Sequence, residues 1–224
     1  MLSPERIDAR MRGWYSLLAP LGIPPAEIYQ VFDELVVAYS QPHRHYHTLE
    51  HIDDMLRVVG KLASLADEPF AVQLACWFHD AVYDPHADDN EARSAEWAER
   101  VLAGWGLAPL ATRVAQLVLA TRHGDTTAGI SEPSRDAAVL LDADLAILAA
   151  PQARYDRYAA GIRREYAWVP EQQYRLGRAG VLREFLARPR IYHTTRLFEE
   201  GEALARLNIE RELAKLEGTE AVSA

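Results

Sequence analysis

The chain has 224 residues, of which 49% are hydrophobic and 25% are charged, and these values are ordinary for one compact globular domain. Its formal net charge of -9 argues against a nucleic-acid polymer as the main partner, because such binding depends on basic surfaces that neutralise phosphates. A single cysteine, Cys76, excludes an internal disulfide and a thiolate zinc cluster.

Targeting and membrane signals are missing from the sequence pattern. The longest apolar run, at 139–148, is interrupted by Asp142 and Asp144, so it does not predict a membrane span. The first residues carry acid and base early and lack the apolar core of a signal peptide. We therefore expect a cytoplasmic protein with no membrane partner, and a homo-oligomer stays open.

Prolines and apolar residues at helical spacing divide the first half of the chain into helices. Ser3-Pro4 predicts the start of the first helix, and a polar, aromatic loop is expected at 39–46. Asp88 and Glu91 resemble an acidic capping box at the start of a later helix. The predicted helices of this half begin at or near Pro4, Pro25, Thr48, Pro69, Asp88 and Leu107.

The second half is also predicted to be helical. One helix follows Pro133, and Pro151 and Pro170 separate the next two, before a last helix at roughly 195–216. No alternating strand pattern of useful length occurs. We predict an all-α single domain over 1–224, with a metal-binding core at roughly 44–148 and a C-terminal helical extension at roughly 151–216.

Histidines and aspartates form a pattern typical of a metal site. His47 and His51 are four residues apart, so on a helix they lie on one face. His79 and Asp80 are adjacent and belong to a different element. Imidazole and carboxylate together suit a hard or borderline divalent cation, so we expect a site between packed helices.

The ordered residues His51, His79-Asp80 and Asp144 resemble the HD superfamily of metal-dependent phosphohydrolases. Residues 46–55 are similar to the Tyr-His-Asn-x-x-His-x-x-Asp-Val stretch of cyclic-nucleotide phosphodiesterases, and residues 143–145 to their Ala-Asp-Leu. The local resemblance spans roughly 44–148, and the whole chain resembles a bacterial group of predicted HD-superfamily phosphohydrolases. It implies a single-domain helical bundle of the HD type with additional C-terminal helices.

The resemblance also implies roles for particular residues. His51, His79, Asp80 and Asp144 would be the metal ligands, and Asp80 would also orient the nucleophile. His47 falls where the phosphodiesterases keep the histidine that protonates the leaving oxygen, although it could instead be a structural residue at the helix start. Asp142 stays open as the ligand in place of Asp144, and the Ala-Asp-Leu match favours Asp144.

The implied activity is hydrolysis of a small phosphate ester, for which a nucleotide is one candidate, by water activated on a divalent ion. Manganese, magnesium, iron, cobalt, nickel and zinc all tolerate mixed nitrogen and oxygen ligands, so the sequence leaves the metal open. Two alternatives remain: a di-iron oxygenase of the HD type, and a ligand-binding regulatory module with a vestigial metal site.

Further residues are candidates for a second metal or for substrate. His123 could be such a ligand, or a histidine that interacts with a helix C-terminus. His86 lies in a polar loop, where a surface position is the simpler interpretation. Glu91 could act as an acid or base, or only cap its helix.

The segment from Arg154 to Arg196 is rich in arginine and has no lysine. Arginine forks suit phosphate, although solvated helix faces explain most of the excess. The candidates for substrate phosphate are Arg163, Arg164, Arg178 and Arg190. The candidates for stacking are Tyr166 and Tyr174.

Overall fold

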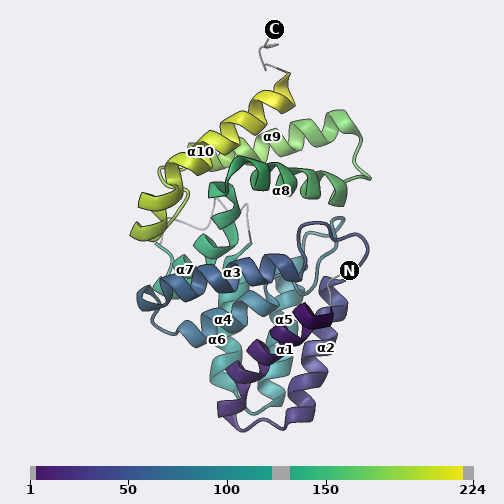
Figure 1. Ribbon diagram of the computed structural model, residues 1–224, viewed down its shortest axis with the longest axis vertical. Helices are drawn as coiled ribbons and strands as arrows, with labels where there is room; N and C mark the ends of the chain where they lie inside the picture. Colours follow the sequence, from purple (N-terminus) through teal and green to yellow (C-terminus); the bar gives the residue numbers. More distant parts are fainter. Residues whose placement is uncertain (1–3, 123–131, 219–224) are drawn as a thin grey trace.

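The structure is a computed structural model, and it describes residues 4–122 and 132–218. Over these ranges the chain is helical and contains no strand, which confirms the all-α prediction (Figure 1). The helices are α1 (Pro4–Leu18), α2 (Pro25–Tyr39), α3 (Leu49–Leu62), α4 (Pro69–Phe78), α5 (Asn90–Gly104), α6 (Ala108–Ala120), α7 (Arg135–Leu145), α8 (Gln152–Glu165), α9 (Glu171–Ala187) and α10 (Thr195–Glu217). Within the described ranges, no helix combines the length and the apolar character that a membrane span needs.

Helix α4 lies at the centre of the N-terminal part of the molecule. Its residues from Leu74 to Phe78 are all buried, which explains why its sequence is apolar on every side. The Trp77 ring packs against Trp14 of α1 and Phe32 of α2, with ring centroids 5.3 and 5.9 Å apart. Because α4 is fixed on every side, the residues that follow it, His79 and Asp80, have a rigid support.

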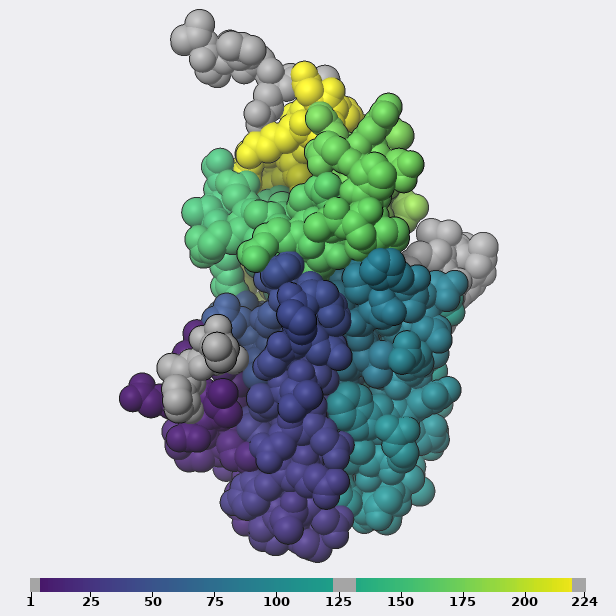
Figure 2. Space-filling view, turned by 90° about the vertical axis from the view of Figure 1, so that its right-hand side faces the viewer, coloured from purple at the N-terminus to yellow at the C-terminus, as the bar shows by residue number. Residues whose placement is uncertain are grey.

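In the described ranges, buried apolar side chains form two clusters. The first extends from Trp14 to Ala143 and belongs to α1–α7. The second extends from Leu145, the last residue of α7, to Leu213, and most of it belongs to the helices from α8 onward. Helix α7 contributes to both clusters, and the C-terminal helices sit on the end of the N-terminal part (Figures 1 and 2).

Polar contacts join the two parts where they meet. Arg154 of α8 forms an ion pair with Asp54 of α3. Arg196 Nη1 of α10 donates to the carbonyl oxygen of Lys61, at 3.0 Å. Glu165, the last residue of α8, accepts hydrogen bonds from the loop that precedes α3. The junction is therefore an ordered polar interface.

The expected capping box at the start of α5 is wrong. Asp89 is the N-cap residue, and its side chain makes no capping hydrogen bond. The amide of Asn90 closes the preceding loop instead, because it donates to the Asp84 carbonyl oxygen and accepts from the Asp84 N–H, both at 2.9 Å. Ser3, the expected cap of α1, lies outside the described residues.

Candidate metal centre

Three predicted ligands converge from the ends of different helices. His51 lies in the first turn of α3, His79 directly follows α4, and Asp144 lies near the end of α7. Both histidines are buried and Asp144 is half-buried. One ligand atom from each lies within 4.8 Å of the others, so this group could hold a metal ion.

The spacing of the ligand atoms fits a single ion. His51 Nε2 lies 3.2 Å from His79 Nε2 and 3.1 Å from Asp144 Oδ1, and His79 Nε2 lies 3.7 Å from Asp144 Oδ1. Ligands at the bond lengths usual for divalent transition metals are separated by roughly 3.0 to 3.4 Å across adjacent positions. Two of the three separations fall in this range, and the third, at 3.7 Å, is about 0.3 Å longer than its upper end, so the group needs only a small adjustment to hold an ion.

The orientation of His79 is set by its own helix. Its Nδ1 lies 2.9 Å from the carbonyl oxygen of Cys76, which can only accept, so Nδ1 carries the proton and donates. The Nε2 atom is then the one that faces the centre. A second hydrogen bond of this kind is the usual way in which proteins orient a ligating histidine.

Asp80 lies at the edge of this group. Its Oδ2 is 3.1 Å from His79 Nε2 and 3.9 Å from His47 Nε2. Burial lowers the pKa of His79, but the charge and hydrogen bond of Asp80, together with the charge of Asp144 and the Cys76 carbonyl, outweigh burial and raise that pKa to about 9. Burial likewise raises the pKa of Asp80, and His79 and His47 more than reverse this. The negative charge that favours a proton on His79 also favours a bound cation.

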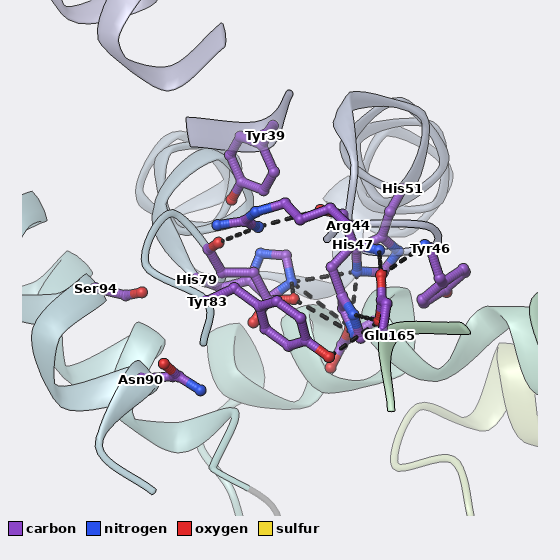
Figure 3. A network of polar contacts seen from close by, with 12 residues as sticks. Tyr39, Arg44, Tyr46, His47, His51, His79, Tyr83, Asn90, Ser94 and Glu165 are labelled. Carbon is purple, nitrogen blue, oxygen red and sulfur yellow. Dashed lines mark hydrogen bonds and ion pairs between the residues drawn. The ribbon is translucent and has the colours of Figure 1, made fainter. Parts of the chain in front are cut away.

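His47 is held by Glu165 of α8, a residue that the sequence did not single out (Figure 3). His47 Nδ1 donates to Glu165 Oε2 at 2.7 Å, which leaves Nε2 on the side of Asp80. Burial lowers the pKa of His47, while the charges of Asp80 and Glu165 raise it by more. The imidazole is thus set up to carry a proton toward the candidate centre.

Glu165 is itself surrounded by donors. Its Oε1 accepts from the backbone N–H groups of His45, Tyr46 and His47, at 2.6, 2.7 and 3.0 Å. Its Oε2 also accepts from the Tyr83 hydroxyl at 3.0 Å. Burial raises the pKa of Glu165, but the bonds from His47 and the backbone outweigh it and lower the pKa to about 2. The carboxylate therefore stays ionised and fixes the 45–47 loop.

Arg44 connects the two segments that carry the histidines. Its guanidinium donates to the carbonyl oxygens of His47, Asp80 and Ala81, at 3.1, 2.7 and 3.1 Å. The side chain is buried, and its neighbours include the Tyr39 ring, 4.9 Å from the guanidinium carbon. Arg44 therefore holds the loop before α3 against the residues after α4.

The choice between Asp142 and Asp144 has a geometric answer. The Asp142 carboxylate accepts from the N–H groups of His193 and Thr194, at 2.7 and 2.8 Å, and from the Thr194 hydroxyl at 2.6 Å. Two residues along a helix is a rotation of roughly 200°, so Asp142 and Asp144 point in different directions. Asp142 binds the segment that begins α10, and Asp144 faces the histidines.

A cavity of about 640 Å³ opens beside this group, which is large enough for a small molecule. His47, His79, Asp80 and Asp144 contribute to its lining. Its aromatic lining residues are Tyr46, Tyr83, Tyr158, Tyr166, Tyr174 and Phe185. Both tyrosines expected to stack on substrate, Tyr166 and Tyr174, are among them.

Of the three candidate ligands for a second metal, His86, Glu91 and His123, the structure describes the first two. His123 lies outside the described residues. His86 is exposed, lies 3.1 Å from Asp84 Oδ1 and stacks on the Trp168 ring at a centroid distance of 4.2 Å. Glu91 is half-buried and lines the cavity. Among the described residues, neither His86 nor Glu91 belongs to a group that could hold an ion.

Of the four arginines expected to bind phosphate, the structure brings Arg178 to the cavity. Arg163 donates to the carbonyl oxygens of Tyr166 and Val169, at 2.7 and 3.2 Å, and so closes the loop after α8. Arg164 is exposed, and the guanidinium carbon of Arg190 lies 3.9 Å from the centroid of the Phe198 ring. Neither of these two lines the cavity.

Comparison with family models, with curated proteins and with solved structures finds no match for this chain.

Proposed function

We propose that this chain is a metal-dependent phosphohydrolase of the HD type that acts on a small phosphate ester. The observation that carries the proposal is the convergence of His51, His79 and Asp144, with Asp80 beside them, at the wall of a cavity of about 640 Å³. The order of these residues in the sequence and their positions at helix ends agree with the HD resemblance. The carboxylates of Asp80 and Asp144 beside the two histidines also favour a bound cation over a bound anion.

A divalent cation bound by these residues would supply Lewis-acid catalysis and would lower the pKa of a coordinated water. The side chains of the chain do the remaining work. Asp80, whose Oδ2 lies 3.1 Å from His79 Nε2 and 3.9 Å from His47 Nε2, would orient the nucleophile. His47 would give the proton on Nε2 to the departing alkoxide, and Glu165 would hold the ring in that orientation.

The di-iron oxygenase alternative needs extra histidine ligands between His79 and Asp144. His86 is one of the two available and lies at the surface beside Asp84 and Trp168, so no observation on the described residues favours a second iron. Phosphoester hydrolysis remains the better supported function.

Metal content and hydrolysis measured together test the proposal. Protein loaded in turn with manganese, magnesium, iron, cobalt, nickel or zinc should hydrolyse p-nitrophenyl phosphate, bis(p-nitrophenyl) phosphate or a member of a nucleotide panel, with release of p-nitrophenol or of inorganic phosphate as the readout. His79→Ala should lose both metal and activity, whereas His86→Ala, a surface control, should keep both. Absence of any bound or activating ion would overturn the proposal, and a paramagnetic di-iron signal with oxygen consumption would replace it with the oxygenase.

The proposed role of His47 as proton donor can be tested by comparing esters with different leaving groups. A proton donor matters for a poor leaving group such as an alkoxide and matters little for p-nitrophenolate. His47→Asn should therefore slow hydrolysis of alkyl esters by roughly 10²- to 10⁴-fold and slow aryl esters much less. Equal losses on both ester classes would assign His47 a structural role.

A further inference from the structure

One face of α9 forms part of the cavity wall. The lining residues from this helix are Gln173, Tyr174, Gly177, Arg178, Val181 and Phe185. All successive members of this set are one, three or four positions apart, so they share one face of the helix. This face belongs to the C-terminal part of the molecule, while the candidate ligands lie in α3, directly after α4 and in α7.

The charge on this face is already compensated. Arg178 Nε donates to Glu212 Oε1 at 2.8 Å and Arg178 Nη2 donates to Glu212 Oε2 at 3.1 Å, and both side chains are 9% exposed. Arg178 Nη2 also donates to the Tyr158 hydroxyl at 3.1 Å. Because Glu212 neutralises the guanidinium, this wall suits the uncharged alcohol part of an ester better than its phosphoryl group.

Gly177 leaves a gap in the same wall. It lies in the interior of α9, where glycine is less favourable than alanine. It is exposed, and no described heavy atom lies within 4 Å of a Cβ placed on it. Close packing within the described chain therefore does not require a glycine here, and the room it leaves belongs to the cavity.

We propose that Gly177 sets the size of the ester that the cavity accepts, and that the substrate carries a bulky, flat, uncharged alcohol part lying on this face of α9. The proposal rests on the proposed phosphohydrolase function. Tyr174 and Val181, three positions before and four positions after Gly177 on this face, also line the cavity and supply apolar surface. A side chain at position 177 would project into the space that the alcohol part occupies.

Gly180 provides a matched control on the same helix. It is also in the interior of α9, and no described heavy atom lies within 4 Å of a Cβ placed on it. It does not line the cavity. Substitution at Gly180 therefore repeats the effect on helix stability without the effect on cavity size.

The test measures binding of phenylphosphonate and 1-naphthylphosphonate to the manganese-loaded full-length protein by calorimetry. These compounds are not hydrolysed, so the readout does not depend on turnover. Gly177→Gln should raise the ratio of the 1-naphthylphosphonate to the phenylphosphonate dissociation constant by about tenfold or more. This is the scale on which a filled pocket discriminates against a larger ligand. Gly180→Gln should leave the ratio within about twofold, and Gly177→Ala should be at least as resistant to urea as the wild type.

An unchanged ratio in Gly177→Gln, an equal change in Gly180→Gln, or no binding of 1-naphthylphosphonate to the wild type would overturn the proposal. Failure of the proposed function looks different. If the wild type hydrolyses no phosphate ester with any metal but shows the expected phosphonate ratios, the phosphohydrolase assignment falls and the role of Gly177 in limiting size is supported.

Discussion

Asp142 and Asp144 lie two residues apart on α7, yet their surroundings differ completely. Asp142 is buried and accepts hydrogen bonds from the segment that begins α10, while Asp144 lies beside His51 and His79. A buried carboxylate with three donors supports the fold, and a carboxylate beside two imidazoles can bind a cation. The two residues should therefore separate folding from metal binding.

Substitution of each aspartate by asparagine tests this separation. Asp144→Asn should weaken metal binding by about 100-fold or more, because loss of an outer-shell partner alone costs about 10- to 100-fold. Asp142→Asn should keep the metal but lower the free energy of unfolding by about 1 to 3 kcal/mol. Metal titration and urea denaturation of both variants measure these effects. A folded Asp142→Asn protein that binds no metal would contradict the assignment.

The sequence could predict His51, His79 and Asp144 because each lies in a short recognisable motif on a predicted helix. It could not predict Glu165, which lies in no motif and contacts residues 45–47 across more than a hundred positions. The sequence does not mark Arg44 either, since its partners are backbone carbonyl oxygens that any sequence supplies. Motifs identify side chains that perform chemistry and do not identify those that position them.

The bonds to Glu165 predict a particular dependence of stability on pH. Its pKa in the folded protein is lowered to about 2, below the value in the unfolded chain. A lowered pKa stabilises the fold above the unfolded pKa, and this contribution is lost as the pH falls from about 5 toward about 2. Its size is on the order of 3 kcal/mol.

Glu165→Gln should therefore be less stable than the wild type at pH 7, and the difference should shrink as the pH falls through this window. Urea denaturation of both proteins between pH 7 and pH 3 measures it. Glu171→Gln, at an exposed position at the start of α9, is the control. Its loss of unfolding free energy at pH 7 should be smaller, because water screens the charge of Glu171. A pH-independent difference for Glu165→Gln would show that its charge does not matter.

At the scale of the elements, the helices were predictable because prolines mark many of their starts and apolar residues recur at helical spacing. The sequence pattern does not reveal how closely the last turns of α8 approach the 45–47 loop. A Cβ placed on Gly161 would lie 3.2 Å from Tyr46 Cβ and 3.3 Å from the His45 carbonyl oxygen. Glycine at this position therefore allows α8 to approach the 45–47 loop closely enough for Glu165 to bind it.

Gly161→Ala should push α8 away from that loop. The expected loss of stability from overpacking is about 1 to 3 kcal/mol, which cancels or exceeds the roughly 1 kcal/mol that alanine adds to a helix. Gly60→Ala in α3, where no described heavy atom lies within 4 Å of the added Cβ, should instead gain about 0.5 to 1 kcal/mol. Urea denaturation compares them, and a Gly161→Ala protein as stable as Gly60→Ala would contradict the close approach.

At the scale of the whole molecule, the candidate centre lies where two apolar clusters meet. Its ligands come from the N-terminal part, while Glu165 and the α9 wall of the cavity come from the C-terminal part. The sequence predicted a core and a C-terminal extension, but it gave no reason to place them on opposite sides of one cavity. That arrangement depends on contacts such as Arg154 with Asp54, which no local pattern encodes.

A metal held by His51, His79 and Asp144 must bind the folded chain, because these ligand atoms come together only when α3, α4 and α7 pack. Binding to the folded state alone stabilises it by about 2.7 kcal/mol when the free ion is at 100 times its dissociation constant. For a chain of this size, removal of the ion by a chelator should lower the melting temperature by roughly 5 to 10 °C. Calorimetry with and without chelator measures the shift, and Asp144→Asn should show almost none. A chelator effect of equal size in Asp144→Asn would mean that the ion binds somewhere else in the molecule.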